Sequence, residues 1–298
     1  MTDKNAQKGT GSLYVVATPI GNLQDITLRA IETLRHVDLI AAEDTRHSRR
    51  LLAAHGIDNQ LISYHEHNER QRTADLIAKL GQGASIALVT DAGTPGVSDP
   101  GYRLVAEAVR CHIPVVPIPG VSAAISALSV AGLPTDSFTF VGFPRRKKNK
   151  RLAQLGELAH LPHTLIFYQS PRRLVSFMHE LASVLGNRAA VLAREQTKIH
   201  EEFIRTSLLE MIPMLSNRDS VKGECTLLVS GATAAEPGAA EIEFALKSAM
   251  AEQDRPISQI VKVVAKQLGL NRKTVYDRAM QLKKSPNDDN NDDGIGNE

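Results

Sequence analysis

Three turns rich in small residues follow strand-like segments and hold the groups best placed to do chemistry. The turns are Thr18–Asn22, Asp91–Gly101 and Pro119–Ser122. In open α/β sheets, ligands bind in the crevice beyond the carboxyl ends of the strands, so turns at such ends converge on one site. Asp91–Gly101 is the densest in small residues, which allow a ligand to approach the backbone closely. The pattern predicts one binding crevice lined largely by backbone.

The segments that must position these turns alternate between strand and helix patterns over the first 240 residues. Strands are expected at Leu13–Ala17, Leu39–Ala42, Ser85–Thr90, Pro114–Ile118, Phe138–Gly142, Thr164–Tyr168, Ala190–Ala193 and Cys225–Ser230. Helices are expected at Leu28–His36, Gln71–Leu80 and Ala123–Val130, the first with Leu28, Ile31 and Leu34 on one apolar face. This alternation predicts an α/β fold.

Several familiar catalytic motifs are absent from the sequence. It has no GxGxxG after a strand, no Walker-type phosphate loop and no GxSxG elbow. These absences remove the usual support for dinucleotide-binding, Walker-type NTPase and α/β-hydrolase functions. His65 and His67 are the best grouped histidines, but no third ligand is implied nearby. We therefore expect no bound metal.

Length and composition indicate about two domains and no membrane segment. The chain has 298 residues, and domains typically contain roughly 100–200. No apolar run approaches the roughly 20 residues that span a bilayer, and residues 1–12 lack the apolar region of a signal peptide. Cys111 and Cys225 form neither a CxxC pair nor a disulfide framework, which suits a reducing compartment. We expect a cytosolic protein.

Composition also divides the chain into five parts. We expect a disordered lead at 1–12, a first α/β lobe at 13–143, a second at 144–232, a helical extension at 241–284 and a disordered acidic tail at 285–298. The second lobe follows a basic linker, Arg145–Arg151, in which six of seven residues are basic. Residues 287–298 hold five carboxylates and no basic residue, and without them the net charge rises from +2 to +7. This mildly basic remainder permits an anionic partner.

The helical extension has the pattern of a helix-turn-helix. Its two helical stretches, Ile257–Leu268 and Lys273–Leu282, are joined by a turn that starts at Gly269. Ala265 and Val275 fall at the small and buried positions of such a motif. The same pattern also occurs in two-helix hairpins that only pack, so nucleic-acid binding and plain packing both remain open.

Many short motifs occur in the same order as in one known family. They are Thr18–Thr27, Ala42–Arg46, Thr90–Pro95, Ser98–Gly101, Pro119–Gly120, Ala131–Pro134, Phe167–Tyr168, Ser170–Pro171, Arg194–Glu195, Thr197–Lys198, His200–Glu201 and Lys222–Glu224. Through them the chain resembles the ribosomal RNA small subunit methyltransferase I family of the tetrapyrrole methylase superfamily, over about residues 13–230 and the helical end. The departures are Gln169 and Arg172 where the family commonly has Glu and His, Gln196 in place of an aliphatic residue, and Gly142–Pro144 where Gly-Phe-Leu-Pro is usual.

The resemblance implies a fold, a reaction and partners. The fold would be two α/β lobes of the tetrapyrrole methylase type with S-adenosylmethionine in the cleft between them, plus a helix-turn-helix-like C-terminal extension. The reaction would be methylation of the ribose 2'-hydroxyl of a cytidine in the decoding region of 16S rRNA, within the small ribosomal subunit and by a homodimer. Because a sulfonium methyl is already activated, the protein mainly has to exclude water and align the acceptor oxygen, and such positioning supplies roughly 7–11 kcal/mol.

The cofactor is expected to contact residues from all three turns. The expected cofactor residues are Pro19, Ile20, Gly21, Asp91, Gly93, Thr94, Pro95, Val97, Gly120, Ser122, Ala123 and Tyr168. Asp91 is interpreted as a hydrogen-bond acceptor for polar groups of the cofactor, and a turn-capping role is its alternative.

The group that accepts the hydroxyl proton is left open among four side chains. Glu43 and Asp44 follow a strand and are expected to face the cleft, as are Glu195 and Lys198. A carboxylate or a neutral lysine acts as a general base when its pKa is suitably perturbed. A structural ion pair is the alternative for each of the four.

An RNA enzyme must also neutralise phosphates. The expected RNA-binding residues are Arg145, Arg146, Lys147, Lys148, Lys150 and Arg151, with Arg272 and Lys273 in the helical extension. Contacts from this basic linker would make RNA affinity depend on salt. The alternative for the linker is a solvated surface without a partner.

Two further functions compete with rRNA methylation. A small-molecule methylase of the same fold would methylate a porphyrinoid and leave rRNA unmodified. A DNA-binding regulator, with the α/β part as a ligand sensor, would bind duplex DNA through the helix-turn-helix without methyl transfer, and it would need to dimerise to read a palindrome.

Overall fold

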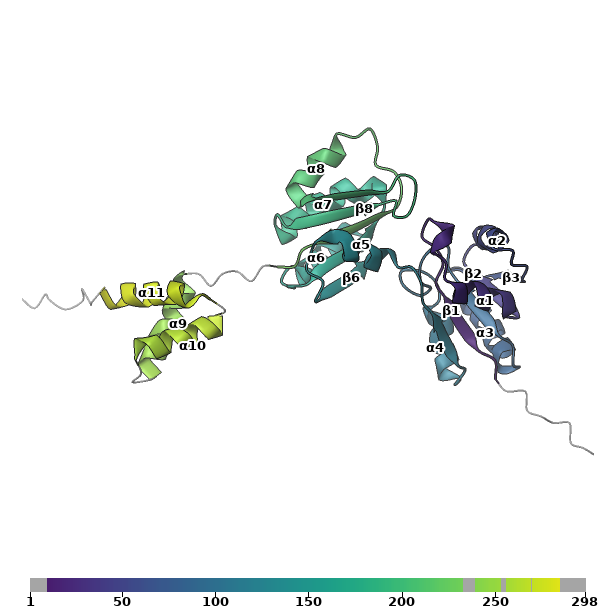
Figure 1. Cartoon of the computed structure of the whole chain (residues 1–298), viewed down its shortest axis with the longest axis horizontal. Helices are drawn as coiled ribbons and strands as arrows, with labels where there is room; N and C mark the ends of the chain where they lie inside the picture. The colour runs from purple at the N-terminus through teal and green to yellow at the C-terminus, as the bar shows by residue number, and fades with distance from the viewer. Residues whose placement is uncertain (1–9, 233–238, 253–255, 269, 285–298) are drawn as a thin grey trace, which may run out of the picture. The chain divides into compact units, whose positions relative to one another are not determined.

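The computed structural model describes residues 10–232, 239–252, 256–268 and 270–284. The chain divides into two compact units, Met1–Ala232 and Thr233–Glu298, and each is described by itself. The first unit contains two five-stranded sheets, and the second consists of helices (Figure 1). Among the helices described, none combines the length and apolar character needed to cross a membrane.

The first sheet is entirely parallel, with strand order β3-β2-β4-β1-β5. Its strands are β1 (Leu13–Val16), β2 (Leu39–Ala42), β3 (Leu61–Ser63), β4 (Ile86–Val89) and β5 (Val115–Ile118). Parallel sheets have both faces covered, which explains why these strands are nearly continuous apolar runs. The predicted strand positions are confirmed, and β3 is a short strand at the sheet edge that the sequence analysis missed.

Helices cover both faces of the first sheet. They are α1 (Leu28–His36), α2 (Thr45–Ala54), α3 (Glu69–Gly81) and α4 (Tyr102–Arg110), preceded by a short 3₁₀ helix, η1 (Leu23–Asp25). One core joins α3 and α4 to Leu13, Leu39 and Leu88, whereas a second core joins α1 and α2 to Val16 and Ile40 on the opposite face. The apolar face predicted for α1 is wrong at its first residue, because Leu28 is 85% exposed.

The second sheet is mixed, with strand order β6-β7-β10-β8-β9. Its strands are β6 (Phe138–Gly142), β7 (Thr164–Gln169), β8 (Ala189–Arg194), β9 (Glu202–Ser207) and β10 (Cys225–Val229). Only β6 and β7 pair in parallel, and the other three pairings are antiparallel. The edge strand β9 was not predicted, because its polar residues and half-buried faces lack an apolar run.

Four helices cover the second sheet, three on one face and one on the other. They are α5 (Ala123–Ala131), α6 (Lys148–Leu158), α7 (Pro171–Leu185) and α8 (Leu208–Ser216). Helices α6, α7 and α8 share one core with Phe167, Leu192 and Leu227. The alanine-rich face of α5 packs on Ile166 and Leu228 from the opposite side.

The boundary between the two sheets differs from the one expected after residue 143. Helix α5 and strand β6 both precede that point, yet they belong to the second sheet. The chain therefore passes from one sheet to the other near the turn Pro119–Ser122. Arg145–Arg151 lies in the turn after β6 and the first residues of α6, so it does not link the two sheets. Long-range packing of α5 decides this boundary, and a local change in composition does not report it.

The described residues of the second unit form a cluster of three helices. Its helices are α9 (Ala239–Glu252), α10 (Ile257–Leu268) and α11 (Arg272–Lys284). Ala265 and Val275 are buried in its core with Leu246, as the helix-turn-helix pattern predicts. The expected acidic tail and the turn residue Gly269 lie outside the described residues. Of the expected disordered lead, residues 10–12 are described, and the Gly11 N–H donates to the Leu80 carbonyl at 2.8 Å.

Candidate functional site

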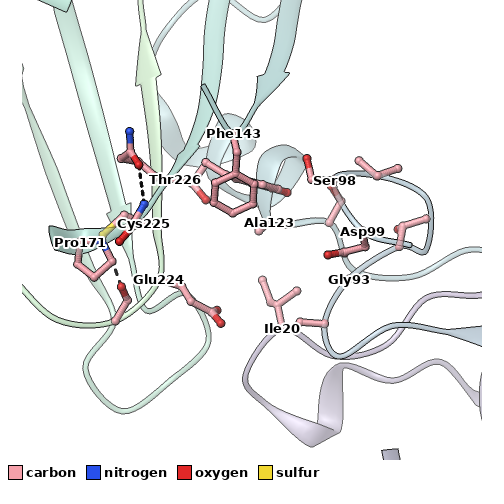
Figure 2. Close-up of a pocket in the computed structure, with 18 residues that line it drawn as sticks. Ile20, Gly93, Ser98, Asp99, Ala123, Phe143, Pro171, Glu224, Cys225 and Thr226 are labelled. Carbon is pink, nitrogen blue, oxygen red and sulfur yellow. Dashed lines mark hydrogen bonds between the residues drawn. The ribbon is translucent and has the colours of Figure 1, made fainter. Parts of the chain in front are cut away.

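A cavity of about 320 Å³ lies in the first unit, where loops from both sheets meet (Figure 2). The lining residues are Ile20, Ala92, Gly93, Thr94, Val97, Ser98, Asp99, Ser122, Ala123, Phe143, Tyr168, Gln169, Ser170, Pro171, Gly223, Glu224, Cys225 and Thr226. We call the side formed by residues 20–123 the turn wall and the side formed by residues 143–226 the facing wall. The turn wall comes from the three turns that the sequence analysis singled out.

Hydrogen bonds to backbone groups hold the turn wall together. The Thr18 N–H donates to the Gly93 carbonyl at 2.8 Å, and the Gly93 N–H donates back to the Thr18 carbonyl at 3.0 Å. The Thr94 hydroxyl reaches the Val121 carbonyl at 3.4 Å, which connects the second turn to the third. Gly93 has φ +80°, a left-handed conformation that favours glycine. The three turns therefore form one pre-assembled surface.

The facing wall depends on side-chain contacts instead. Tyr168 packs edge-on against Phe140 and Phe143, with ring centroids 5.1 and 5.6 Å apart. Behind the wall, the Gln196 amide donates to the Ala123 carbonyl at 3.1 Å and to the Thr226 hydroxyl at 3.2 Å. Gln196, one of the departures from the family pattern, thus ties the facing wall to the first turn of α5.

We call residues 195–198 the bracing loop, because they contact both walls. The Lys198 ammonium donates to Glu195 at 2.9 Å and to Glu224 at 3.0 Å. The Asn22 N–H donates to the Thr197 hydroxyl at 3.0 Å, and a Cβ on Gly21 would lie 2.5 Å from Lys198 Cγ. Glu195 and Thr197 have φ values of +51° and +64°, which are unfavourable for residues with a side chain.

Seven of the twelve expected cofactor residues line the cavity. They are Ile20, Gly93, Thr94, Val97, Ser122, Ala123 and Tyr168. The other five, Pro19, Gly21, Asp91, Pro95 and Gly120, are not among the lining residues. Two of these five are glycines that pack closely against a neighbouring segment. A Cβ on Gly120 would lie 3.0 Å from the Ala17 Cβ, and a Cβ on Gly21 would meet the bracing loop.

Asp91 contacts a neighbouring loop, a role that differs from the turn-capping alternative, and its interpretation as a cofactor acceptor stays a prediction. Its Oδ1 accepts the Asp44 N–H at 3.1 Å, and its own N–H donates to Glu43 Oε2 at 3.3 Å. These contacts connect the ends of β2 and β4. Asp91 therefore holds the loops of the first sheet together, and its carboxylate does not line the cavity.

Each of the four candidate general bases forms a hydrogen bond or an ion pair with another residue of the chain. Burial raises the pKa of Glu43, which accepts the Asp91 N–H. Asp44 pairs with Arg46 at 2.7 Å, and this hydrogen bond holds the pKa of Asp44 well below its usual range. In the bracing loop, the Glu224 N–H lowers the pKa of Glu195.

Lys198 is held in its charged form. Burial alone would lower its pKa, but its hydrogen bonds to Glu195 and Glu224 raise the pKa above the ordinary value. A neutral lysine is needed for a general base, so these contacts favour the ion-pair role for Lys198.

The sequence did not predict most of the residues that line the facing wall, nor Asp99 in the turn wall. Asp99 lines the cavity, and burial followed by the charges of Glu43, Asp91 and Glu224 raises its pKa to about 7. The segments Ser98–Gly101 and Lys222–Glu224 were matched to the family, and that match was the available signal for these positions. Among the described residues, no group of three or more histidine, cysteine, aspartate or glutamate side chains is placed to hold a metal ion.

The expected RNA-binding residues divide by exposure. Arg145, Arg146, Lys147, Lys148 and Lys150 are exposed around the start of α6. Arg151 is different, because it forms a largely buried ion pair with Glu180 at 2.6 Å and also donates to the Arg145 carbonyl. Its charge therefore stabilises the α6–α7 contact. In the second unit, Arg272 and Lys273 are exposed at the start of α11.

Comparisons with known proteins identify relatives of the whole chain. Residues 12–212 match the family described as Tetrapyrrole (Corrin/Porphyrin) Methylases, and residues 236–283 match the RsmI C-terminal HTH domain. A protein of Micromonospora olivasterospora named ribosomal RNA small subunit methyltransferase I is 46% identical over 279 residues, which cover 91% of this chain and 87% of that protein. A protein of Escherichia coli O157:H7 with the same name is 43% identical, over 93% of this chain and 98% of that protein.

Solved structures share the fold at lower identity. Uroporphyrin-III-C-methyltransferase from Thermus thermophilus superposes with a TM-score of 0.53 at 21% identity, over 74% of this chain and 94% of that one. A structure of the Thermus thermophilus enzyme complexed with S-adenosylhomocysteine gives 0.54 at 19% identity, over 73% and 97%. At these identities the likeness concerns the fold.

Proposed function

The chain belongs to the ribosomal RNA small subunit methyltransferase I family of tetrapyrrole methylases, and we propose on that premise that it methylates the ribose 2'-hydroxyl of a cytidine in the decoding region of 16S rRNA. The methyl donor is S-adenosylmethionine. The observation that carries the proposal is the cavity where the two walls meet, because most lining residues of its turn wall belong to motifs shared with this family.

The cavity residues fit this cofactor in size and character. A volume of about 320 Å³ lies at the lower end of the roughly 300–1,000 Å³ of small-molecule sites. The lining combines apolar surfaces such as Ile20 and Phe143 with serine and threonine hydroxyls. Asp99 provides a negative charge that complements a sulfonium cation. When bound, the cofactor supplies a methyl group already activated for transfer.

The protein contributes positioning and exclusion of water. The backbone bonds between Thr18 and Gly93 fix the turn wall before any ligand arrives. The aromatic contacts of Tyr168 and the bracing loop close the opposite side. Holding an acceptor oxygen in line with the transferred methyl group in such a site accounts for roughly 7–11 kcal/mol of barrier lowering.

Recognition of RNA is assigned to the exposed part of the basic segment, Arg145–Lys150. If four of its charges each neutralise one phosphate, the logarithm of affinity falls with the logarithm of salt concentration with a slope of about −2.8 on single-stranded RNA. Because modification occurs at the 2'-hydroxyl, the substrate is RNA with an accessible nucleotide. A homodimer, a cytoplasmic location and the assembled small subunit as substrate belong to the same proposal and are supported by family membership.

The deciding experiment is methyl transfer from labelled S-adenosylmethionine to small ribosomal subunits from cells that lack this enzyme, followed by mass spectrometry of the digested rRNA. Label on the ribose of a decoding-region cytidine is expected. Label in a porphyrinoid and none in rRNA would replace the proposal with a small-molecule methylase.

The RNA surface has its own test. Replacing Arg145, Arg146, Lys147 and Lys148 by serine is expected to flatten the salt slope of RNA binding by about 2.8, because four phosphate contacts are lost. Cofactor affinity, measured by calorimetry, stays unchanged. The matched control replaces four other exposed basic residues by serine, namely Arg49 and Arg50 on α2 and Arg70 and Lys79 on α3. An unchanged RNA affinity and slope in the Arg145–Lys148 variant would show a solvated surface.

A further inference from the structure

An exposed aromatic ring borders the cavity. Two aromatic side chains line it, and of these Tyr168 is half-buried whereas Phe143 is 60% exposed. Because a phenyl ring gains free energy when it leaves water, an exposed ring at a ligand site favours a flat apolar partner. In Figure 2 the Phe143 ring is seen between Thr226 of the facing wall and Ser98 of the turn wall. Phe143 is therefore placed to contact a group that enters the cavity from solvent.

The backbone holds Phe143 at this position. The pairing of β6 with β7 shifts register between Phe140 and Gly142, and Gly142 has φ +69°. A Cβ on Gly142 would lie 2.7 Å from Ser98 Oγ, so glycine lets this segment run against the turn wall. The Phe143 ring packs edge-on against Tyr168, with the two centroids 5.6 Å apart. The ring is thus fixed before a ligand arrives, and more than half of the residue still faces solvent.

Basic side chains follow Phe143 directly in the chain. Arg145, Arg146 and Lys147 are exposed, and none of them forms an ion pair within the described residues. Their backbone is anchored, because the Arg151 guanidinium donates to the Arg145 and Arg146 carbonyls at 2.9 Å each. Two residues span at most about 7 Å, so Phe143 and Arg145 can contact the base and a phosphate of one nucleotide. Proteins that bind single-stranded nucleic acid combine these two features, a ring that stacks on a base and a basic surface that follows the backbone.

The base that fits this position belongs to the nucleotide being methylated. Its ribose must reach the methyl group inside the cavity, which leaves its own base at the exposed side. The adenine of S-adenosylmethionine is the other base present, but small-molecule sites bury roughly 70–90% of their ligand. Buried lining residues such as Gly93 and Thr226 offer that enclosure, whereas Phe143 does not. Unpaired RNA bases are characteristically splayed out and stacked on aromatic side chains.

We propose that Phe143 stacks on the base of the cytidine whose ribose enters the cavity, and that this contact positions the 2'-hydroxyl for methyl transfer. Every base has a π-face, so stacking tolerates any sequence. The contact therefore selects an unpaired nucleotide and does not select cytosine over the other bases. A base inside a duplex is covered on both faces and cannot make it. This inference rests on the proposed function and adds a substrate contact to it.

The first test compares Phe143→Ala with Phe138→Ala, the same change at the start of β6, where Phe138 is 41% exposed and outside the cavity lining. Stacking on an aromatic ring contributes roughly 5–150-fold per base to affinity. We expect kcat/KM for small ribosomal subunits to fall by a factor in that range in Phe143→Ala and to stay unchanged in Phe138→Ala. Cofactor affinity, measured by calorimetry, stays unchanged in both. Phe143→Leu, which is apolar but has no ring, is expected to lose a similar factor, whereas Phe143→Tyr keeps the ring and the activity.

A second readout does not require turnover. The chain contains no tryptophan, so Phe143→Trp introduces a single indole fluorophore at the proposed contact. A base that stacks on an indole ring quenches its fluorescence. We expect quenching when a single-stranded oligocytidine binds the full chain in the presence of S-adenosylhomocysteine, with binding followed separately by the anisotropy of a labelled oligonucleotide. Phe138→Trp is the control and is expected to show no quenching, and S-adenosylhomocysteine alone is expected to leave Phe143→Trp unquenched.

The outcomes separate the inference from the proposed function. Wild-type protein that transfers no methyl group to small subunits overturns both. An active wild type with an equally active Phe143→Ala or Phe143→Leu overturns the assignment of Phe143 alone, and so does RNA that binds Phe143→Trp without quenching. Quenching by S-adenosylhomocysteine alone, with weaker cofactor binding in Phe143→Ala, would assign the ring to the cofactor adenine and would also overturn it.

Discussion

The two walls of the cavity are built by different means. The turn wall is held mainly by backbone hydrogen bonds between neighbouring turns, such as the pair between Thr18 and Gly93, with one bond from the Thr94 hydroxyl to the Val121 carbonyl. The facing wall is braced by side chains that are distant in sequence, as when Gln196 bonds to Ala123 and Thr226. Backbone contacts need only turn-forming residue types, whereas the side-chain contacts require particular partners. Substitutions should therefore affect the two walls in different ways.

Left-handed backbone conformations occur on both sides of the cavity. On the turn wall, left-handed φ values occur at Gly93 and Gly96, where they are inexpensive, and at Ser98. In the bracing loop they occur at Glu195 and Thr197, which carry side chains. Such conformations cost of order 1–3 kcal/mol each and persist only when surrounding contacts hold them. The facing wall therefore depends on its ion pairs and hydrogen bonds for its shape.

The largest predicted effect is on the facing wall, at Gly223→Ala. Gly223 has φ +88°, and an added Cβ would lie 2.3 Å from the Glu195 Cγ. We expect the free energy of unfolding to fall by about 3 kcal/mol, from backbone strain together with displacement of Glu195. Urea denaturation measures it. Gly132→Ala is the control, because Gly132 has φ +74° with nothing within 4 Å, and it should lose only the strain of about 1–2 kcal/mol. Equal losses in the two variants would contradict the role of Glu195.

On the turn wall, the substitution that corresponds to Gly223→Ala is Gly93→Ala. Its φ is +80°, but the nearest atom to an added Cβ, Ile20 Cγ2, is 3.8 Å away. The expected stability loss is about 1–2 kcal/mol, from strain alone. Because Gly93 lines the cavity, we expect S-adenosylmethionine affinity measured by calorimetry to fall by about tenfold, or about 1.4 kcal/mol. Full affinity with normal stability would remove Gly93 from the cofactor surface.

The smallest predicted effect is at Gln196→Leu, which replaces a buried amide with the aliphatic type usual in the family. Two hydrogen bonds are lost, to Ala123 and Thr226, and leucine adds apolar contacts in a site where Gln196 is 7% exposed. We expect the free energy of unfolding to fall by about 1 kcal/mol, the net value of a typical hydrogen bond. Thermal unfolding of this variant beside Gln71→Leu, a substitution at an exposed position of α3 outside the cavity lining, measures the difference. A gain in stability would show that packing outweighs both hydrogen bonds.

The strands and turns of the first sheet were predictable because their signals are local. Buried parallel strands are apolar on both faces, and the glycine- and proline-rich turns follow them directly. The short edge strand β3 and the polar edge strand β9 lack such a run and were missed. Leu28 shows the converse, since an apolar residue at a helical spacing can still face solvent.

Local sequence was sufficient to locate the turns, the helical end and the family motifs, because each depends on residues close together in the chain. The tertiary structure determined which distant segments and side chains contact one another. It assigned α5 and β6 to the second sheet, committed Arg151 to Glu180 and Asp91 to the loops beside Glu43, and placed Asp99 in the cavity lining. These outcomes depend on burial and on charges brought together from distant segments, which no local pattern contains.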